Sequence, residues 1–291
     1  MGRPGGYWSG MGALLARLID DAALFPPESA PMDEALSAHR AATGASRHAR
    51  RDPLVGRFLC PASRFAELRT HLVPEDLLDL GVIADTGLEE LPKTLDAVRA
   101  EPRVRPSSVE IALPRDADQA RAAAVTIARL PPGVPARIEV RRSPGWLHVL
   151  DRLAAARDSA ARVAGTLADE APSAAALAAF ISACAERGLP FTCAGGLDQG
   201  VRGAAHQGPM TVLLATAHAA AGEPERHVRR TLGRTDAEGL AGDLLALTDV
   251  QARAARRLLV AFAASDVRGV RAELAAAGLI RTPDTGEDMS P

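Results

Sequence analysis

Residues 108–140 have the sequence SVEIALPRDADQARAAAVTIARLPPGVPARIEV. The stretch begins with a short β-rich run at 108–113, continues with an alanine-rich segment of helical period at 116–130, and ends with a second β-rich run at 136–140. Prolines and Gly133 separate these segments, because such residues interrupt regular structure. A strand, a helix and a strand in this order are typical of two parallel strands joined by a crossover helix.

The same alternation of short β-rich runs and longer helical segments extends over most of the chain. Eight runs are predicted to be strands, and they lie at Ala22–Phe25, Gly56–Cys60, Leu80–Ala84, Ser108–Leu113, Ala136–Val140, Arg162–Leu167, Pro190–Ala194 and Met210–Ala215. Eight strands joined by helices predict an α/β fold, a (β/α)8 barrel of the TIM type. An open, doubly wound parallel sheet is the alternative.

After the last predicted strand the pattern contains only helical segments, one of them predicted at 248–263. We therefore expect four regions in the chain. They are an N-terminal segment at 1–17, the barrel at 18–222, an eighth helix with a helical annex at 223–281, and a polar, disordered tail at 282–291.

The composition argues against two kinds of partner. The chain has 34 basic and 36 acidic residues and a net charge of -2, so it has no field of one sign to attract nucleic acid or an anionic membrane. No apolar stretch reaches the roughly 18 residues that a membrane-spanning helix needs. Three cysteines, without a disulfide framework or a signal sequence, favour a reducing compartment. We predict a cytoplasmic protein, and the sequence leaves its oligomeric state open.

Lys93 is the single lysine of the chain. An enzyme that forms a Schiff base needs a lysine amine in its site. Lys93 follows Pro92 in the first turn of a predicted helix, where its side chain would face solvent. The nearby carboxylates of Glu89, Glu90 and Asp96 would keep its ammonium group protonated. Any lyase or isomerase activity is therefore predicted to proceed without a Schiff-base lysine.

The candidate catalytic residues are three carboxylates. In a (β/α) barrel the functional side chains come from the C-terminal ends of the strands and from the loops that follow. This rule selects Asp85, Glu110 and Glu139, which we expect to converge at one mouth of the barrel. Glu110 and Glu139 lie within apolar strands, where a carboxylate needs a partner or a raised pKa. A structural ion pair is the alternative, and Arg141 is the nearest partner for Glu139.

Residues that could bind an anion or a substrate follow the fifth and seventh predicted strands. The consecutive glycines after the seventh strand expose backbone N–H groups, and barrels frequently bind phosphate there. A tight turn is the alternative interpretation of these glycines. The candidates are Arg141, Gly195, Gly196, Asp198 and Arg202. Asp20 and Asp21 fall just before the first predicted strand.

The sequence does not indicate a metal site. The seven histidines are scattered, with no His-x-His or His-Glu-x-x-His spacing. Cys184 and Cys193 are nine residues apart, which is not a spacing of metal ligands. The sequence does not identify a cofactor either.

Several motifs resemble those of one family. Residues 18–27 read LIDDAALFPP, residues 31–35 read PMDEA, and residues 56–64 read GRFLCPASR. Together with matches that continue to residues 274–280, they resemble a widespread bacterial family of uncharacterised proteins. The resemblance covers most of the chain but implies no established activity.

The chain departs from that family's pattern in two strands. The family carries a segment of the type PFKxTxGLHH, whereas residues 190–199 here read PFTCAGGLDQ. Thr192 therefore stands in the place of the lysine, and Asp198 and Gln199 stand in the places of the two histidines. The family's sixth segment is of the type Lys-x-Arg-x-Gly-Gly, but residues 163–168 read VAGTLA. If those basic groups carry the family's chemistry, this chain has lost it or performs a different one.

Two hypotheses on function follow from these residues. The first is an enzyme or binding protein for a small anionic metabolite, with acid–base chemistry of the lyase or isomerase type by Glu110 or Glu139. Its anion would be held by Arg141, Arg202 or the glycine loop. The second is a degenerate, non-catalytic barrel that serves as a regulatory or structural partner of another protein.

Overall fold

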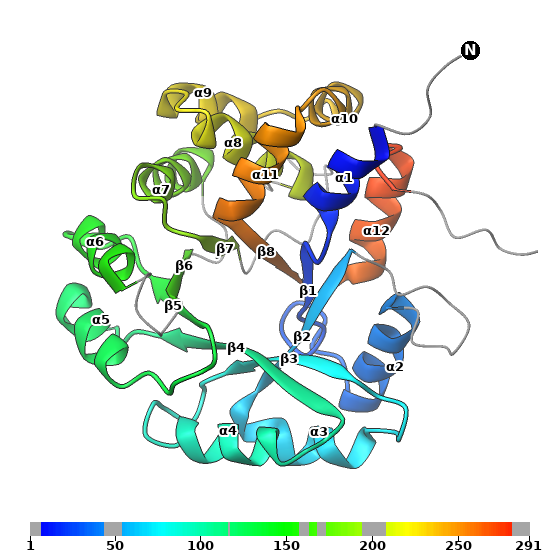
Figure 1. Ribbon diagram of the computed structural model, residues 1–291, viewed down its shortest axis with the longest axis vertical. Helices are drawn as coiled ribbons and strands as arrows, with labels where there is room; N and C mark the ends of the chain where they lie inside the picture. Colours follow the sequence, from blue (N-terminus) through cyan, green and yellow to red (C-terminus); the bar gives the residue numbers. More distant parts are fainter. Residues whose placement is uncertain are drawn as a thin grey trace, which may run out of the picture.

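The computed structural model describes residues 7–43, 54–115, 117–156, 163–167, 173–193 and 208–280. Within these residues eight strands form one closed sheet, arranged as a ring in Figure 1. The strands are β1 (Ile19–Asp21), β2 (Val55–Pro61), β3 (Leu78–Ile83), β4 (Val104–Ala112), β5 (Ala136–Val140), β6 (Val163–Leu167), β7 (Phe191–Cys193) and β8 (Leu259–Ala264).

Each strand runs parallel to its two neighbours, and neighbours in the sheet are consecutive in the sequence. β1 also pairs with β8, with Asp20 opposite Ala263, and this pairing closes the ring. A closed sheet of parallel strands linked by helices is a (β/α)8 barrel. The predicted α/β barrel is confirmed, and the open, doubly wound alternative is wrong.

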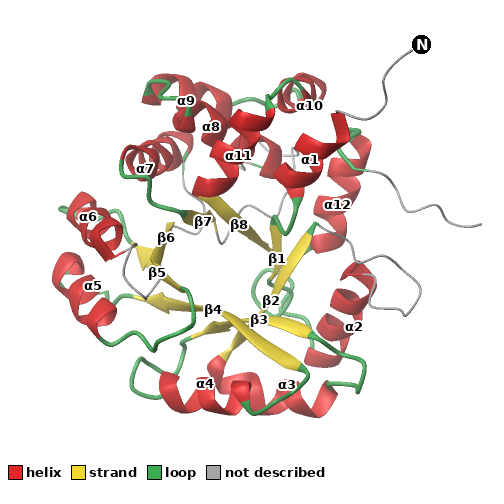
Figure 2. Cartoon of the chain, in the orientation of Figure 1, coloured by secondary structure: helices red, strands yellow, loops and turns green. Residues whose placement is uncertain are grey.

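The helices lie outside the ring of strands (Figure 2). They are α1 (Tyr7–Leu15), α2 (Met32–Thr43), α3 (Phe65–His71), α4 (Leu91–Arg99), α5 (Gln119–Ala128), α6 (Trp146–Ala156), α7 (Ala174–Glu186), α8 (Pro209–Ala220), α9 (Glu225–Leu232), α10 (Ala237–Leu245), α11 (Asp249–Leu258) and α12 (Val267–Ala276), with a 3-10 turn at Ala62–Arg64. α5 is shorter than its predicted range of 116–130. It begins after Asp118, because the Asp118 side chain accepts a hydrogen bond from the backbone N–H of Arg121 and caps the helix.

The apolar core lies between the outer face of the sheet and the helices. Side chains alternate between the two faces of a strand, and the outward residues include Phe58, Leu80, Ile138 and Phe262, all of them buried. They belong to apolar clusters that they share with residues of the surrounding helices. Burial of this layer stabilises the fold by about 25 cal/mol for each Å² of apolar surface removed from water.

Charged side chains fill the N-terminal end of the barrel. Asp79 on β3 binds Arg17 at 2.7 Å and Arg105 at 2.6 Å. Arg256, in the last turn of α11, donates a hydrogen bond to the main-chain carbonyl of Ala16 at 2.9 Å. Each of these charges therefore has a partner at this end of the barrel.

The first strand lies earlier than expected. It was predicted at 22–25, but β1 consists of residues 19–21, and 22–25 belong to the loop that follows. The prediction was wrong because two consecutive carboxylates, Asp20 and Asp21, interrupt the apolar pattern that marks a buried strand in a sequence. Asp20 and Asp21 lie within the strand and are both buried, since partners from other elements bind their carboxylates.

The eighth strand also lies elsewhere. The run at 210–215 is part of α8, whereas the strand that closes the barrel is β8, inside the helix predicted at 248–263. α8 is buried along nearly its whole length, so it lacks the polar face that marks a helix in a sequence. The region 223–281 is therefore not a helical annex, because it supplies the last strand of the barrel.

Two parts of the predicted organisation concern the chain ends. The N-terminal segment at 1–17 contains α1. The tail predicted at 282–291 lies outside the described residues. Across the described ranges, no helix is both long enough and apolar enough to cross a membrane.

We expect Gly56→Ala to destabilise the protein by about 1–3 kcal/mol, because the new methyl group overfills a packed site. A Cβ atom at Gly56 would lie 2.7 Å from Oδ1 of Asp20 and 3.3 Å from the carbonyl oxygen of Ile19. Urea unfolding measures the change. Gly242→Ala in α10 is the control, since its Cβ would meet no atom within 4 Å, and it should stabilise the helix by up to about 1 kcal/mol. Equal stability of Gly56→Ala and wild type would contradict this tight packing.

Candidate functional site

Four charged residues occupy the middle of the barrel, and we call Asp20, Arg57, Glu110 and Arg137 the barrel cluster. Asp20 on β1 is 1% exposed. Its Oδ1 accepts hydrogen bonds from the backbone N–H and the Nε of Arg57 at 2.9 and 3.0 Å. Its Oδ2 accepts from Nη1 of Arg137 at 3.0 Å. The carboxylate thus joins β1 to its neighbour β2 and to β5 across the barrel.

Arg137 connects Asp20 to Glu110. It lies opposite Glu110 in the register of β4 and β5, and its Nη1 also donates to Oε1 of Glu110 at 3.2 Å. The residue is 3% exposed. Its second terminal nitrogen, Nη2, is buried and has no hydrogen-bond partner among the described residues. A buried donor without a partner loses its hydration without compensation, so this atom could bind a ligand or a water molecule.

A second polar atom in this region, the hydroxyl oxygen of Ser108, is also buried without a hydrogen-bond partner among the described residues. Ser108 on β4 lies two residues before Glu110 and therefore shares its face. The Ser108 side chain is fully buried, and its Oγ has no hydrogen-bond partner in the described part of the chain. The interior of the barrel thus contains an unsatisfied hydroxyl as well as an unsatisfied guanidinium nitrogen.

Glu110 has an unusual proton affinity. Burial raises the pKa of its carboxyl group to about 8, the negative charge of Asp20 adds to the rise, and the positive charge of Arg57 opposes it. The side chain is nevertheless 12% exposed, so solvent can reach it. At neutral pH the group is mainly protonated, and a pKa near the working pH suits a residue that both donates and accepts protons.

Glu139 lies two residues after Arg137 on β5 and so points to the same face. It lies opposite Ala112, which is two residues after Glu110 on the same face of β4, so the two carboxyl groups lie on one side of neighbouring strands. Burial raises the pKa of Glu139 itself, while the charges of Arg141 and Arg115 lower it. The structure therefore brings two of the three expected carboxylates, Glu110 and Glu139, into one region.

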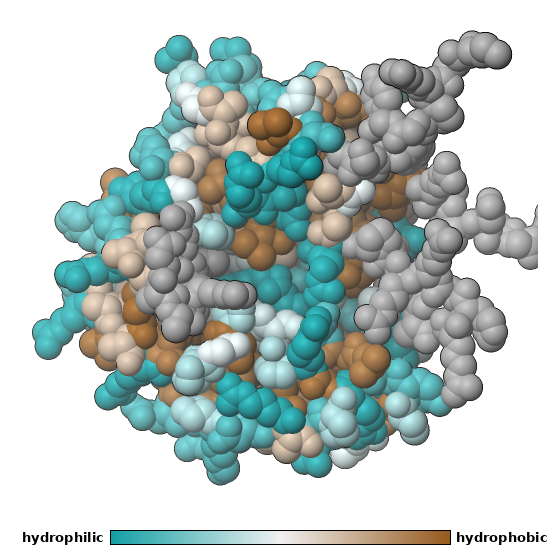
Figure 3. Space-filling view, viewed as in Figure 1, coloured by the Kyte–Doolittle hydropathy of each residue, from teal (hydrophilic) through white to brown (hydrophobic). Residues whose placement is uncertain are grey.

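The barrel opens to solvent at the level of Glu139. Ala112 lies opposite Glu139 in the register and shares the face of Glu110, yet it is exposed. Arg141, one residue beyond β5, is partly exposed, but its Nε is buried and has no partner among the described residues. We call Ala112, Glu139 and Arg141 the barrel mouth. In the space-filling view, hydrophilic residues lie near the centre of the face that shows the ring of strands (Figure 3).

Asp85 has a different environment. It follows β3, and its Oδ1 accepts a hydrogen bond from the backbone N–H of Ser63 at 3.0 Å. Its Oδ2 accepts a second hydrogen bond, from the hydroxyl of Ser63. Asp85 therefore holds the turn after β2, and its hydrogen bonds are directed at that turn.

Four further residues were predicted to bind the anion. Gly195, Gly196, Asp198 and Arg202 lie outside the described residues. The structure thus positions Arg141 alone of that set.

The potential nucleophiles of the chain differ in position. Lys93 lies on α4 with its side chain 87% exposed, 3.8 Å from a carboxylate oxygen of Glu90. Cys60, Cys184 and Cys193 are free and buried. Burial raises the pKa of Cys60 and of Cys193 to about 12, so these thiols stay protonated at neutral pH.

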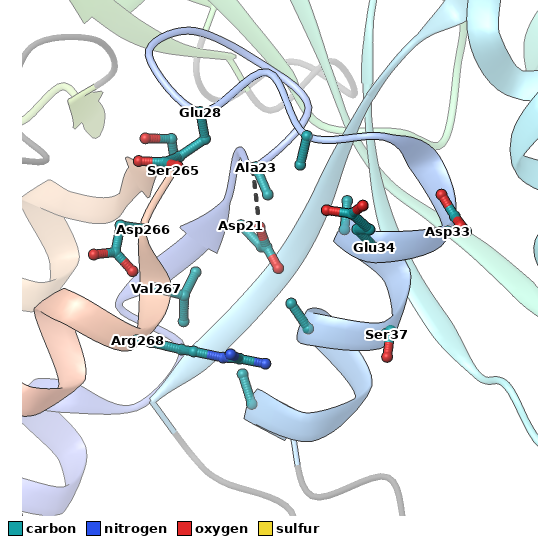
Figure 4. Close-up of a pocket in the computed structure, with 14 residues that line it drawn as sticks. Asp21, Ala23, Glu28, Asp33, Glu34, Ser37, Ser265, Asp266, Val267 and Arg268 are labelled. Carbon is teal, nitrogen blue, oxygen red and sulfur yellow. Dashed lines mark hydrogen bonds between the residues drawn. The ribbon is translucent and has the colours of Figure 1, made fainter.

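A separate cavity of about 620 Å³ lies outside the barrel, between α2 and the start of α12 (Figure 4). Five of its fourteen lining residues are acidic, among them Glu28, Asp33 and Glu34, and one, Arg268, is basic. Asp21, the buried carboxylate of this cavity, already accepts hydrogen bonds from Nδ1 of His39 at 2.9 Å and from the backbone N–H of Ala23 at 3.0 Å. An acidic lining repels anions, so the cavity does not suit the predicted ligand.

Across the described residues, no three His, Cys, Asp or Glu side chains are grouped so that they could hold a metal ion. That Asp20, Arg57 and Arg137 belong to one cluster was not predicted from the sequence. Arg137 could have been selected from its spacing, because it lies two residues before Glu139 on the same face of a strand. The link from Asp20 to Arg57 depends on the pairing of segments that are 37 residues apart.

Comparison with protein-family models gives no match for this chain. No curated protein and no solved structure is significantly similar to it.

We expect Glu110→Gln to change how stability depends on pH. In the unfolded chain Glu110 titrates near its ordinary value of 4.5, and in the folded protein near 8. Between these values unfolding releases a proton, so rising pH destabilises the wild type until pH 8 is passed. Each pKa unit corresponds to about 1.4 kcal/mol. Glutamine resembles the protonated form and does not titrate.

Chemical unfolding of both proteins across this pH range measures the effect. Glu110→Gln should match the wild type near pH 5 and become the more stable of the two toward pH 9. Parallel curves for the two proteins would show that Glu110 has an ordinary pKa in the folded state.

We expect Asp20→Ala to cost about 3–5 kcal/mol, because it leaves two buried guanidinium groups without their counter-ion. Asp20→Asn, which retains the volume of the side chain, keeps the test usable if the alanine variant does not fold. Lys93→Ala is the control and should change stability by less than about 0.5 kcal/mol, since exposed pairs contribute little. Calorimetric unfolding measures all three. A loss below about 1 kcal/mol for both Asp20 variants would contradict the role of the carboxylate.

Proposed function

We propose that the barrel binds a small anionic metabolite at its C-terminal mouth and performs acid–base chemistry of the lyase or isomerase type. Arg137 binds an anionic group of the ligand through Nη2, and Glu110 donates a proton to the ligand or accepts one from it. Glu139 is the second acid–base group. The reaction uses no lysine Schiff base, in keeping with the exposed position of Lys93.

The observation that carries the proposal is the unpartnered Nη2 atom of Arg137. Nη1 of Arg137 already binds Asp20 and Glu110, which fixes the position of the guanidinium group. Nη2 remains available to a ligand. Guanidinium groups bind carboxylate and phosphate oxygens through short, charge-assisted hydrogen bonds. A ligand at this nitrogen would lie beside Glu110, within reach of its proton.

The charges of the barrel cluster support an anion. Burial raises the pKa of Asp20, and the charge and hydrogen bonds of Arg57 oppose this rise. Both of its oxygens accept hydrogen bonds from guanidinium groups, which is the pattern of an ionised carboxylate. Glu110 is mainly protonated at neutral pH. Two arginine charges are therefore balanced by one carboxylate, and a buried site with excess positive charge favours a ligand of negative charge.

The alternative function is a degenerate barrel that serves as a regulatory or structural partner of another protein. In that case the barrel cluster would be a structural ion network that links strands. The alternative predicts that small anions do not stabilise the protein. For either function we propose a cytoplasmic location, which the three free, buried cysteines support.

Thermal unfolding with inorganic phosphate, acetate and succinate tests the binding part of the proposal. An anion at one hundred times its dissociation constant should stabilise the wild type by about 2.7 kcal/mol. Arg137→Lys keeps the positive charge but removes Nη2, the nitrogen proposed to bind the anion. This variant should lose most of the stabilisation by anions. Arg105→Lys, at the N-terminal end of the barrel, is the matched control and should retain it. Absence of stabilisation by every anion would favour the alternative function.

Proton exchange in D2O tests the chemical part. Small 2-hydroxy and 2-oxo carboxylates are incubated with the protein, and NMR follows the replacement of carbon-bound hydrogen by deuterium. A bound substrate should exchange faster than in buffer alone, and the rate should rise toward pH 8, where Glu110 loses its proton. Glu110→Gln should abolish the acceleration while leaving anion binding intact. Exchange that is equally fast in Glu110→Gln would remove Glu110 from the mechanism.

A further inference from the structure

Two guanidinium groups on β5 have nitrogen atoms without a partner. Nη2 of Arg137 and Nε of Arg141 are both buried and unbonded among the residues that the structure describes. The two residues are four positions apart, so they belong to the same face of the strand. At about 3.3 Å per residue their backbones are separated by roughly 13 Å along the strand direction.

The two arginines occupy different depths. Arg137 lies in the interior, where it is 3% exposed and bound to Asp20 and Glu110. Arg141 is partly exposed and lies beyond the last residue of β5, Val140. One unsatisfied guanidinium nitrogen is therefore deep in the barrel, and the other is at its mouth.

Glu139 lies between these two positions. Arg115 and Arg141 follow the C-terminal ends of the neighbouring strands β4 and β5. Burial raises the pKa of the Glu139 carboxyl group, whereas the positive charges of both arginines lower it. Two arginines therefore face one carboxyl group at the mouth, and even an ionised Glu139 would leave a net positive charge there. A single anionic group bound to Arg137 would not neutralise this charge.

We propose that the ligand carries two anionic groups, one bound by Arg137 inside the barrel and one bound by Arg141, assisted by Arg115, at the barrel mouth. The ligand class is a short dicarboxylate or a phosphorylated carboxylic acid. The part of the ligand between the two groups then lies beside Glu110 and Glu139. This inference rests on the proposed anion-binding function and specifies its substrate class.

Titration calorimetry with a matched set of anions tests the inference. The set contains acetate and inorganic phosphate, the dicarboxylates succinate and glutarate, and 3-phosphonopropionate. We call the anions with two charged ends two-ended anions. A second charge-assisted hydrogen bond adds affinity, so the wild type should bind the best two-ended anion at least about tenfold more tightly than acetate. The tightest of the set distinguishes a dicarboxylate from a phosphorylated acid.

The arginine variants locate the second group. Arg141→Gln should reduce the preference for two-ended anions to less than about threefold, with little change in the affinity for acetate. Arg142→Gln is the matched control, because Arg142 is the adjacent residue but lies over the ring of Trp146, with 5.6 Å between its Cζ and the ring centre. It should bind like the wild type.

The outcomes separate the two proposals. If none of the anions binds, the proposed function itself is wrong. If acetate or phosphate binds as tightly as the two-ended anions, or if Arg141→Gln keeps their advantage, the barrel binds an anion but the two-ended class is wrong. Loss of all binding in Arg141→Gln, acetate included, would also contradict the proposal that Arg137 and Arg141 bind separate anionic groups.

Discussion

The carboxylate of Asp20 pairs with two arginine side chains inside the barrel. Guanidinium groups remain charged in proteins, and a charge buried without a partner costs several kcal/mol. Asp20 is the carboxylate that Arg57 and Arg137 share, so its loss would leave both guanidinium groups short of a counter-ion. The three residues belong to β1, β2 and β5, so these ion pairs link strands on opposite sides of the barrel. The polar interior thus depends on one residue of a three-residue strand.

A polar interior is compatible with a stable barrel because the apolar core lies on the other side of the sheet. The barrels of many enzymes are filled by branched apolar side chains, whereas the outward residues of this sheet, such as Phe58 and Ile138, pack against the helices. The inward positions are then free for charged groups. The raised pKa of Glu110 follows from this arrangement, since burial and the neighbouring charge of Asp20 both disfavour a second negative charge.

The sequence predicts the fold class because each crossover unit leaves a local pattern, as at 108–140. It does not locate β8, for two physical reasons. α8 is buried between other elements and shows no polar face, so its apolar residues resemble a strand. β8 follows α11 directly, with Leu258 ending the helix and Leu259 beginning the strand, so no turn residue marks the boundary. Local periodicity cannot separate two elements that both bury apolar residues.

The candidate site was predictable to the extent that it depends on single strands. Glu110 and Glu139 stand out as carboxylates in apolar runs, and the structure places them in one region. The partner of Glu110 was not predictable in the same way, because register between strands decides it. With Glu110 opposite Arg137 in the register of β4 and β5, the guanidinium group that binds Glu110 comes from the neighbouring strand. A shift of one residue would turn Arg137 outward, so the register that closes the barrel also determines which side chains can act together.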